Sequence, residues 1–377
     1  MARLKDDPML SNFPHIQSLK PDPNINRFIN YLLGKTKNYI APLVEFIVDE
    51  PVIKKIITGI HQREWVDPGS DHESQKKYLD NLIFFWFRMG YDMMRYESAP
   101  NYPGSAARVT VNTASNSNAT RSWAEESIGA ITSWEDFEQY KFPKVEEVDF
   151  FAFEYLNDHL PEGMGLALAH GGGLFERVSW IFSIEKLCYL LYDQPDLVEA
   201  VTQKISEIQL AFYRNIMDFD HLSAIFPGDD MGFRSATIIS PADLRKYFLP
   251  FHKQIAEMAH ARGVPYFLHS CGNILKIMPD LIESVGIDGK HSYEDAIIPI
   301  EKFQEMFGDK IAVLGGLDVN FLTMATQDQV RARVRKTTEV CGTRGRFAIG
   351  SGNSIPDYVP VENYLAMVDE VISMKNS

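Results

Sequence analysis

The sequence predicts an α/β fold, namely a (β/α)8 TIM barrel with additional N-terminal helices. Short apolar runs alternate with helical patterns at spacings of roughly 25 to 40 residues, the pattern of βαβ units in a parallel sheet. Polar, titratable residues follow run after run in the C-terminal half. No G-x-G-x-x-G follows any of these runs, which counts against an open dinucleotide-binding sheet.

The N-terminal part of the chain has helical patterns, and we expect residues 1–90 to form a helical extension packed on a barrel of residues 91–377. Helices are predicted over 27–33, 44–58 and 75–89. The last of these is amphipathic and rich in aromatic residues, which is more typical of a packing face than of a ligand site.

Seven strands are predicted from the apolar runs, and an eighth is expected between residues 100 and 165. The seven lie at 91–96, 165–170, 222–226, 266–268, 287–290, 311–314 and 346–349. The stretch 97–122 contains prolines, glycines and a Ser/Asn/Thr cluster from 112 to 120. It is predicted to be a loop, either a lid or a solvated excursion.

Helices are predicted between and after these strands. Ser240 is the N-cap of one helix, with Pro241 at the first helical position and Asp243 in the first turn, and this helix is expected to continue to residue 262. Thr326 and Gln329 match a capping box that opens a helix ending near 340. The remaining helices are predicted at 175–191, 195–217, 274–285, 300–307 and 361–375.

Composition excludes several classes of protein. The chain of 377 residues is 45% hydrophobic and 23% charged, which is ordinary for a globular protein. A net charge of −14 without a basic run argues against nucleic-acid binding. The three cysteines are widely spaced, which favours a reducing compartment over a disulfide framework. With no signal-peptide run and no bilayer-spanning stretch, the expected location is the cytoplasm, without a membrane partner.

His269 and Cys271 lie at the end of the predicted strand 266–268, in the sequence PYFLHSCGN. With one residue between them, their side chains can point the same way on an extended backbone. Imidazole and thiolate together suit zinc, so this pair is a candidate metal site. The alternative interpretation is a core histidine beside a small buried cysteine.

Other polar residues follow the remaining strands, where the active site of a parallel barrel lies. They are His170, Asp229, Asp230, His291, Glu294, Asp318, Asn320, Ser351 and Asn353, with Arg234 as the basic residue near the same rim. Each has a structural alternative. Asp229 and Asp230 can cap the following loop, Asp318 can be a turn residue after two glycines, and Asn353 can adopt a left-handed backbone between Gly352 and Ser354.

Three motifs resemble the uroporphyrinogen decarboxylase superfamily, over roughly the last two-thirds of the chain. They are YFLHSCGN at 266–273, GGLD at 315–318 and GSGNSIPDYVPVENYLAMV at 350–368. The resemblance implies a (β/α)8 barrel. It also implies one of two activities, that of the haem-pathway decarboxylases or that of the zinc- and corrinoid-linked methyltransferases.

The motifs resemble the methyltransferase branch more closely. The decarboxylases carry an arginine-bearing stretch of the type M-R-Q-A-G-R-Y, and the nearest piece here is Met94-Arg95-Tyr96. The methyltransferases carry H-x-C, matched by His269 and Cys271, and a second cysteine downstream. Ser351 occupies that second position, and Cys341 falls on the wrong side of the following strand. Asp229, Asp230, His291 or Glu294 can complete a zinc site instead, or the chain is a paralogue that has lost the metal.

The expected activity is transfer of a methyl group between a small methylated substrate and a corrinoid carried by a partner protein, with zinc bound by His269 and Cys271. The substrate can be an aryl methyl ether, as in O-demethylation, a methylamine, methanol or a thiol. Asp230 and Glu294 are expected to join this pair in catalysis, and an aromatic residue such as Tyr102 to cover the substrate. Decarboxylation of a tetrapyrrole or related carboxylated substrate is the alternative, and the oligomeric state stays open. Residues expected to bind substrate are His170, Asp229, Arg234, His291, Asp318, Asn320, Ser351 and Asn353.

Overall fold

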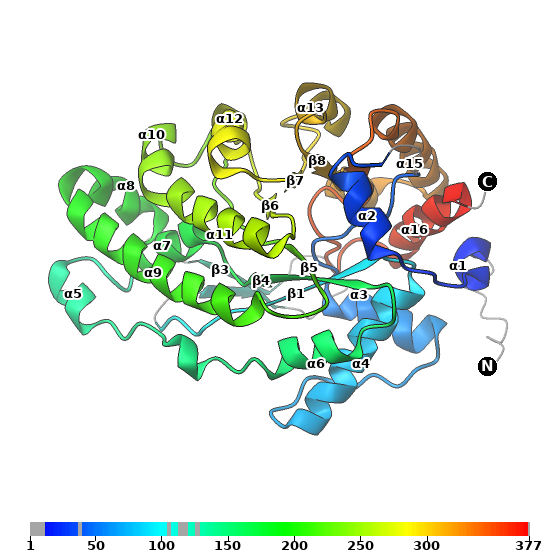
Figure 1. Cartoon of the computed structure of the whole chain (residues 1–377), viewed down its shortest axis with the longest axis horizontal. Helices are drawn as coiled ribbons and strands as arrows, with labels where there is room; N and C mark the ends of the chain where they lie inside the picture. Colours follow the sequence, from blue (N-terminus) through cyan, green and yellow to red (C-terminus); the bar gives the residue numbers. More distant parts are fainter. Residues whose placement is uncertain (1–11, 37–39, 104–106, 112–119, 125–128, 376–377) are drawn as a thin grey trace.

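The structure is a computed structural model that describes residues 12–36, 40–103 and 129–375, together with the backbone of 107–111 and 120–124. Most of the predicted polar cluster at 112–120 lies outside the described residues. In Figure 1 the helices surround a set of strands at the centre of the molecule.

Seven parallel strands follow one another in chain order through the described part of the fold. Pairing joins β1 to β4 and β5, and joins β6 to β7, β8 and β9. Parallel bridges from Ile225 to Tyr266 and from Gly228 to His269 connect the two groups. The strands are β1 (Met93–Ser98), β4 (Gly165–His170), β5 (Leu222–Ile225), β6 (Phe267–His269), β7 (Gly289–His291), β8 (Ala312–Leu314) and β9 (Phe347–Ala348). All seven strands predicted from the apolar runs are confirmed to within a few residues.

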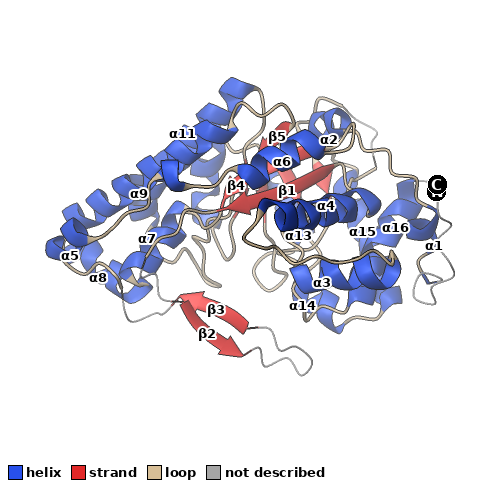
Figure 2. Cartoon of the chain, turned by 90° about the horizontal axis from the view of Figure 1, so that it is seen from below, coloured by secondary structure: helices blue, strands red, loops and turns tan. Residues whose placement is uncertain are grey.

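The eighth extended segment is N-terminal, so its expected place between residues 100 and 165 was wrong. Leu43 forms a parallel bridge with Ile349, next to β9, and Arg95 on β1 donates a hydrogen bond to the carbonyl of Phe46. The segment 41–48 therefore lies between β9 and β1. Between residues 100 and 165, the described strands before β4 are β2 (Ala107–Val111) and β3 (Thr120–Ala124). These two form a separate antiparallel ribbon apart from the parallel strands (Figure 2).

The predicted start of the helix over 44–58 is also wrong, because residues 41–48 are extended. Residues 41–48 read APLVEFIV, a nearly continuous apolar run of the kind that forms a fully buried strand. Helix α3 (Glu50–Lys55) begins only after Asp49, with Pro51 in its first turn, and a π-helical turn, Ile56–Ile60, continues it.

The other helices lie between the strands or cover the ends of the barrel. They are α1 (Pro14–Ser18), α2 (Ile25–Leu32), α4 (His72–Arg88), α5 (Trp134–Gln139), α6 (Phe151–His159), α7 (Leu174–Phe182), α8 (Ile184–Asp193), α9 (Pro195–Ile216), α10 (Pro241–Asp243), α11 (Leu249–Arg262), α12 (Met278–Asp280), α13 (Ile300–Phe307), α14 (Val319–Met324), α15 (Gln327–Gly342) and α16 (Val361–Lys375). The single helix predicted over 175–191 is two helices, because Ser183 has a φ of 69° and caps α8.

Alternate residues of the successive strands share one buried inner cluster, as the period of two of a strand requires. Small and large side chains alternate in it, and residues of α2 close one end. The cluster consists of Phe28, Tyr31, Leu32, Val44, Phe46, Met93, Ala167, Ala224, Phe226, Phe267, Ala312, Leu314 and Ala348. Two positions beyond Met93, Phe267 and Gly289, the same face carries Arg95, His269 and His291, so the barrel lining becomes polar at the C-terminal ends of the strands.

The two described ends of the chain meet on one side of the barrel. Asp369 of α16 accepts hydrogen bonds from the backbone N–H groups of His15 and Ile16, at the start of α1 (Figure 1). Within the described ranges, no helix combines the length and the apolar character that crossing a bilayer requires.

Candidate active site

His269 is the last residue of β6 and lies in the polar upper layer of the barrel. Its side chain is buried, and its imidazole stacks on the ring of Phe46 with the ring centroids 3.9 Å apart. The guanidinium of Arg95 lies 3.6 Å from the centre of the same Phe46 ring. Phe46 thus fixes the plane of the His269 imidazole, and Arg95 of β1 packs on Phe46.

Asp230, His269 and Cys271 converge at this point. The sulfur of Cys271 lies 3.3 Å from Nε2 of His269, and Oδ1 of Asp230 lies 3.6 Å from the same nitrogen. The backbone N–H of Cys271 donates to Oδ1 of Asp230 across 2.8 Å, which ties the loop after β5 to the loop after β6. One nitrogen, one sulfur and one carboxylate oxygen thus lie within 4.8 Å of one another.

The sulfur of Cys271 accepts hydrogen bonds from two other loops. The side-chain amide of Asn353 donates across 3.1 Å, and the hydroxyl of Ser292 lies 3.8 Å away. Burial, and then the nearby Asp230 carboxylate, raise the pKa of the Cys271 thiol well above its usual value. Burial likewise raises the pKa of Asp230 and lowers that of His269. Without a cation these groups stay neutral more readily than in water. A bound dication would favour the thiolate of Cys271 and the carboxylate of Asp230, and would keep the imidazole of His269 neutral.

His291, the last residue of β7, connects His269 to β9. The Nδ1 atoms of the two imidazoles are 2.7 Å apart, and Nε2 of His291 lies 3.2 Å from the carbonyl oxygen of Ser351. Burial lowers the pKa of His291 to about 3. Ser351 in turn donates its backbone N–H and its hydroxyl to the two carboxylate oxygens of Glu45.

A buried cation, Lys290, lies beside this cluster. Its ammonium donates to the carbonyl of Ser292 and lies 4.5 Å from the centre of the Tyr293 ring. Burial lowers the pKa of Lys290 to about 8, against the opposing influence of Cys271, Asp230 and Glu294. Glu294 itself lines, with Lys290, a cavity of about 10 Å³.

Two predicted site residues are buried in contacts with the rest of the chain. The carboxylate of Asp229 accepts hydrogen bonds from the backbone N–H groups of Phe175 and Glu176 and lies 2.9 Å from Nε2 of His252. It therefore acts as an acceptor for the N-terminus of α7. Nδ1 of His170 lies 2.5 Å from the hydroxyl of Tyr213, and its Nε2 has no hydrogen-bond partner among the described residues.

The remaining predicted residues do not join the Asp230–His269–Cys271 group. Asp318 caps α14 by accepting from the N–H groups of Asn320 and Phe321, the turn role that the sequence left open. Asn320 and Arg234 are exposed. Tyr102 is buried, and the guanidinium of Arg177 lies 5.2 Å from the centre of its ring.

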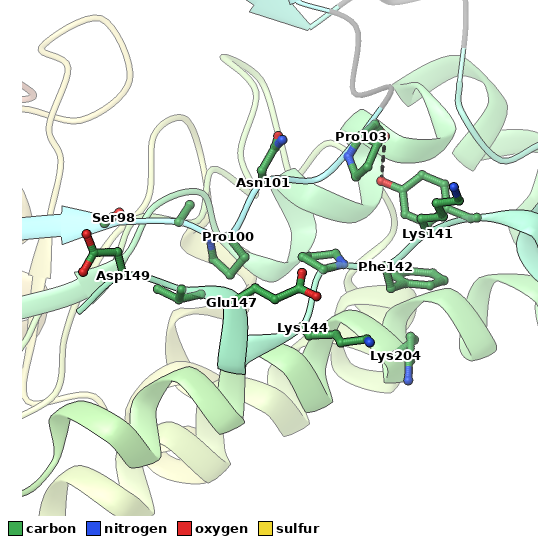
Figure 3. Close-up of a pocket in the computed structure, with 14 residues that line it drawn as sticks. Ser98, Pro100, Asn101, Pro103, Lys141, Phe142, Lys144, Glu147, Asp149 and Lys204 are labelled. Carbon is green, nitrogen blue, oxygen red and sulfur yellow. Dashed lines mark hydrogen bonds between the residues drawn. The ribbon is translucent and has the colours of Figure 1, made fainter. Parts of the chain in front are cut away.

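A separate, open cavity of about 910 Å³ lies beyond the end of β1 (Figure 3). None of the residues predicted to form the site lines it. Its lining residues are Ser98, Ala99, Pro100, Asn101, Pro103, Tyr140, Lys141, Phe142, Pro143, Lys144, Glu147, Val148, Asp149 and Lys204. The hydroxyl of Tyr140 donates to the carbonyl of Pro103 across one side of this cavity.

The sequence did not identify several residues that contact the Asp230–His269–Cys271 group or its neighbours. Glu45 and Phe46 belong to a segment predicted to be helical, and the pattern around Lys290 predicts only the end of a strand. Arg95 belongs to the piece nearest to the decarboxylase motif, and no local pattern identifies it as a partner of the Phe46 ring. The charge of Glu45 within an apolar run was the available signal, since such groups are rarely buried without a partner.

Comparison with known proteins gives a consistent family. The family described as Uroporphyrinogen decarboxylase (URO-D) matches residues 88–374. The curated protein "Uroporphyrinogen decarboxylase" of Syntrophotalea carbinolica is 26% identical over 190 residues, which is 50% of this chain and only about half, 52%, of that protein. The solved structure of a methyltransferase from Methanosarcina mazei is 16% identical, with a TM-score of 0.66, and the match covers 94% of this chain and 99% of that one. The chain therefore belongs to the uroporphyrinogen decarboxylase family and has its α/β barrel fold.

Proposed function

We propose that the protein is a methyltransferase that moves a methyl group between a small methylated substrate and a corrinoid carried by a partner protein. The observation that carries the proposal is the convergence of Asp230, His269 and Cys271 at the C-terminal ends of the strands. In parallel barrels this end is where catalytic residues gather. The resemblance of the fold to a methyltransferase supports the same choice.

The donor set fits zinc. Catalytic zinc sites use three protein ligands drawn from imidazole nitrogen, thiolate sulfur and carboxylate oxygen, and keep a further position open. His269, Cys271 and Asp230 offer one donor of each kind. Zinc, when bound there, supplies a Lewis acid that activates a thiol or polarises the heteroatom carrying the methyl group.

The chain's own residues hold the sulfur and supply protons. Asn353 and Ser292 direct hydrogen bonds at Cys271 and orient its sulfur toward His269. Loss of a methyl cation from a neutral ether, methanol or a methylated thiol leaves negative charge on the donor oxygen or sulfur, so a proton or a cation must lie nearby. Lys290 supplies a cation beside the Asp230–His269–Cys271 group. Burial, and then the charges of Asp230 and Asp229, raise the pKa of Glu176, which favours its protonated form.

The corrinoid is assigned to a separate protein because the sequence has no D-x-H-x-x-G cobalamin pattern. An in-line displacement requires the cobalt to face the methyl group on the side opposite the leaving heteroatom. The C-terminal end of the barrel is the end at which both can meet. The expected location of this reaction is the cytoplasm.

Two experiments test the proposal. Protein purified without a polyhistidine tag is expected to contain one zinc, which Cys271→Ala loses and the exposed-cysteine control Cys188→Ala retains. The protein is then mixed with reduced corrinoid and aryl methyl ethers, methylamines, methanol or methylated thiols, and methylcobalamin is followed by absorbance. If no donor methylates cobalt, and no methylated corrinoid is consumed by a thiol, the proposal fails.

Decarboxylation is the second candidate, favoured by the description of the family and of its curated relative. A substrate with several carboxylates needs several cations that face it. Arg95 already donates to the carbonyl of Phe226 and pairs with Glu97, and Arg234 is exposed. Turnover of uroporphyrinogen by metal-free protein would reverse this ranking.

A further inference from the structure

We propose that His291 is a positioning residue that holds His269 in the tautomer protonated on Nδ1, so that the lone pair of Nε2 faces Cys271 and Asp230. Metal binding at that lone pair rests on the proposed function, whereas the tautomer itself belongs to the chain without metal. The role follows from three contacts taken in order, starting from the backbone of β9.

The first contact, between Nε2 of His291 and the carbonyl of Ser351, shows that this nitrogen carries a proton. A carbonyl oxygen can only accept a hydrogen bond, so the nitrogen 3.2 Å from the Ser351 oxygen, Nε2 of His291, is the protonated one. Gly315 leaves room for this contact. A Cβ at Gly315 would lie 2.3 Å from the Ser351 oxygen and 2.7 Å from Nε2 of His291.

The second contact, between the Nδ1 atoms of His291 and His269, determines which nitrogen of His269 is protonated. His291 is fully buried, and the described hydrogen-bond partners of its ring are His269 and the Ser351 carbonyl, with no carboxylate to pair with a charged imidazole. The neutral ring with its proton on Nε2 carries a lone pair on Nδ1. That nitrogen lies 2.7 Å from Nδ1 of His269. Two nitrogens at this distance share one proton, and it therefore belongs to His269.

The third contact shows what the remaining lone pair faces. Neutral His269 protonated on Nδ1 has an unprotonated Nε2, which lies 3.3 Å from the sulfur of Cys271 and 3.6 Å from Asp230. The second ring nitrogen of a zinc-binding histidine commonly donates to an outer partner in this way. Here that partner is another imidazole rather than a carboxylate or a backbone carbonyl.

Ser351 acquires a role that differs from metal binding. Its N–H donates to Oε1 of Glu45 across 2.8 Å and its hydroxyl donates to Oε2 across 2.5 Å. Both residues are buried, so Glu45 holds Ser351, the residue that presents its carbonyl to His291, by two contacts. The residue at the position expected for a second cysteine thus supports His269 from a distance, through His291.

Nitrogen NMR of ¹⁵N-histidine-labelled, metal-free protein tests the tautomer directly, because protonated and unprotonated ring nitrogens have well-separated shifts. His269→Gln identifies the signals of His269. In the wild type, Nδ1 of His269 is expected to be protonated and Nε2 unprotonated. His291→Gln retains an acceptor and a donor and is expected to preserve this pattern, whereas His291→Leu removes the acceptor and is expected to give a mixture of tautomers.

Titration with zinc and cobalt(II) gives a second readout. His291→Leu is expected to bind both metals about 10- to 100-fold more weakly than the wild type, as loss of an outer partner does, and His291→Gln to recover most of that loss. Protonation of His269 on Nε2 in the wild type, or a single unchanged tautomer in His291→Leu, overturns the inference. A correct tautomer in protein that transfers no methyl group contradicts only the proposed function.

Discussion

The side-chain amide of Asn353, beyond β9, donates a hydrogen bond to the sulfur of Cys271, beyond β6, across 3.1 Å. A donor at this distance stabilises a thiolate more than a thiol. The contact therefore favours the form of Cys271 that binds metal.

Asn353→Leu is expected to weaken zinc binding by about 10- to 100-fold, because a hydrogen bond to a charged group contributes about 1.5–3 kcal/mol. Competition with a chromogenic chelator measures the affinity. Asn320→Leu is the matched control, since Asn320 is exposed in the first turn of α14 and its side chain makes no hydrogen bond in the described contacts. Equal affinities of the two variants would contradict this role of Asn353.

Glu45 gives a prediction on pH and stability. Burial raises its pKa to about 8 from the ordinary value of 4.5, so between these values the folded protein holds a proton that the unfolded chain releases. The free energy of unfolding therefore falls as pH rises through this window. Glu45→Gln removes this titration. The free energy of unfolding of the variant, minus that of the wild type, is therefore expected to increase by an amount on the order of 4 kcal/mol between pH 4.5 and pH 8.

Urea unfolding at several pH values between 4.5 and 8 measures this difference. Glu162→Gln, at an exposed position, serves as the control and is expected to follow the wild type. Parallel pH profiles for the wild type and Glu45→Gln would show that the carboxyl of Glu45 is ionised in the folded protein.

Ser351→Cys tests whether a cysteine at this position, where the methyltransferases carry their second cysteine, binds zinc. Because the hydroxyl of Ser351 donates to Glu45, the substituted thiol is expected to leave zinc affinity unchanged. Stability is expected to fall by about 1 kcal/mol, since a thiol is a weaker donor than a hydroxyl. Chelator competition and urea unfolding give the two values. A gain in zinc affinity would instead place position 351 among the ligands.

Asp229 and Asp318 both follow strands and accept backbone N–H groups at the start of a helix, α7 for Asp229 and α14 for Asp318, but they differ in burial. Asp229→Ala is expected to lower the free energy of unfolding by about 3–5 kcal/mol, because it leaves His252 and two N–H groups of α7 without their buried acceptor. Asp318→Ala is expected to lower it by about 1 kcal/mol, the usual value of a helix cap. Equal losses in urea unfolding would contradict this distinction.

Local features of the sequence determined most helices and strands. Helices α13 (Ile300–Phe307) and α16 (Val361–Lys375) begin and end where the pattern predicts, and Thr326 with Gln329 forms the predicted capping box. Helix caps and hydrophobic periodicity can be predicted from the sequence because they involve residues within a few positions of one another. The pair His269 and Cys271 was readable for the same reason, as both follow one strand.

Only the tertiary structure decided what surrounds that pair. Segment 41–48 is as apolar as a buried helix, and its extended form depends on pairing with β9, about three hundred residues away. That pairing brings Glu45 to Ser351, and Phe46 to His269, across separations that no local pattern encodes. A buried carboxyl such as Glu45 is costly by itself, and the groups that make its burial tolerable become neighbours only when the barrel is assembled.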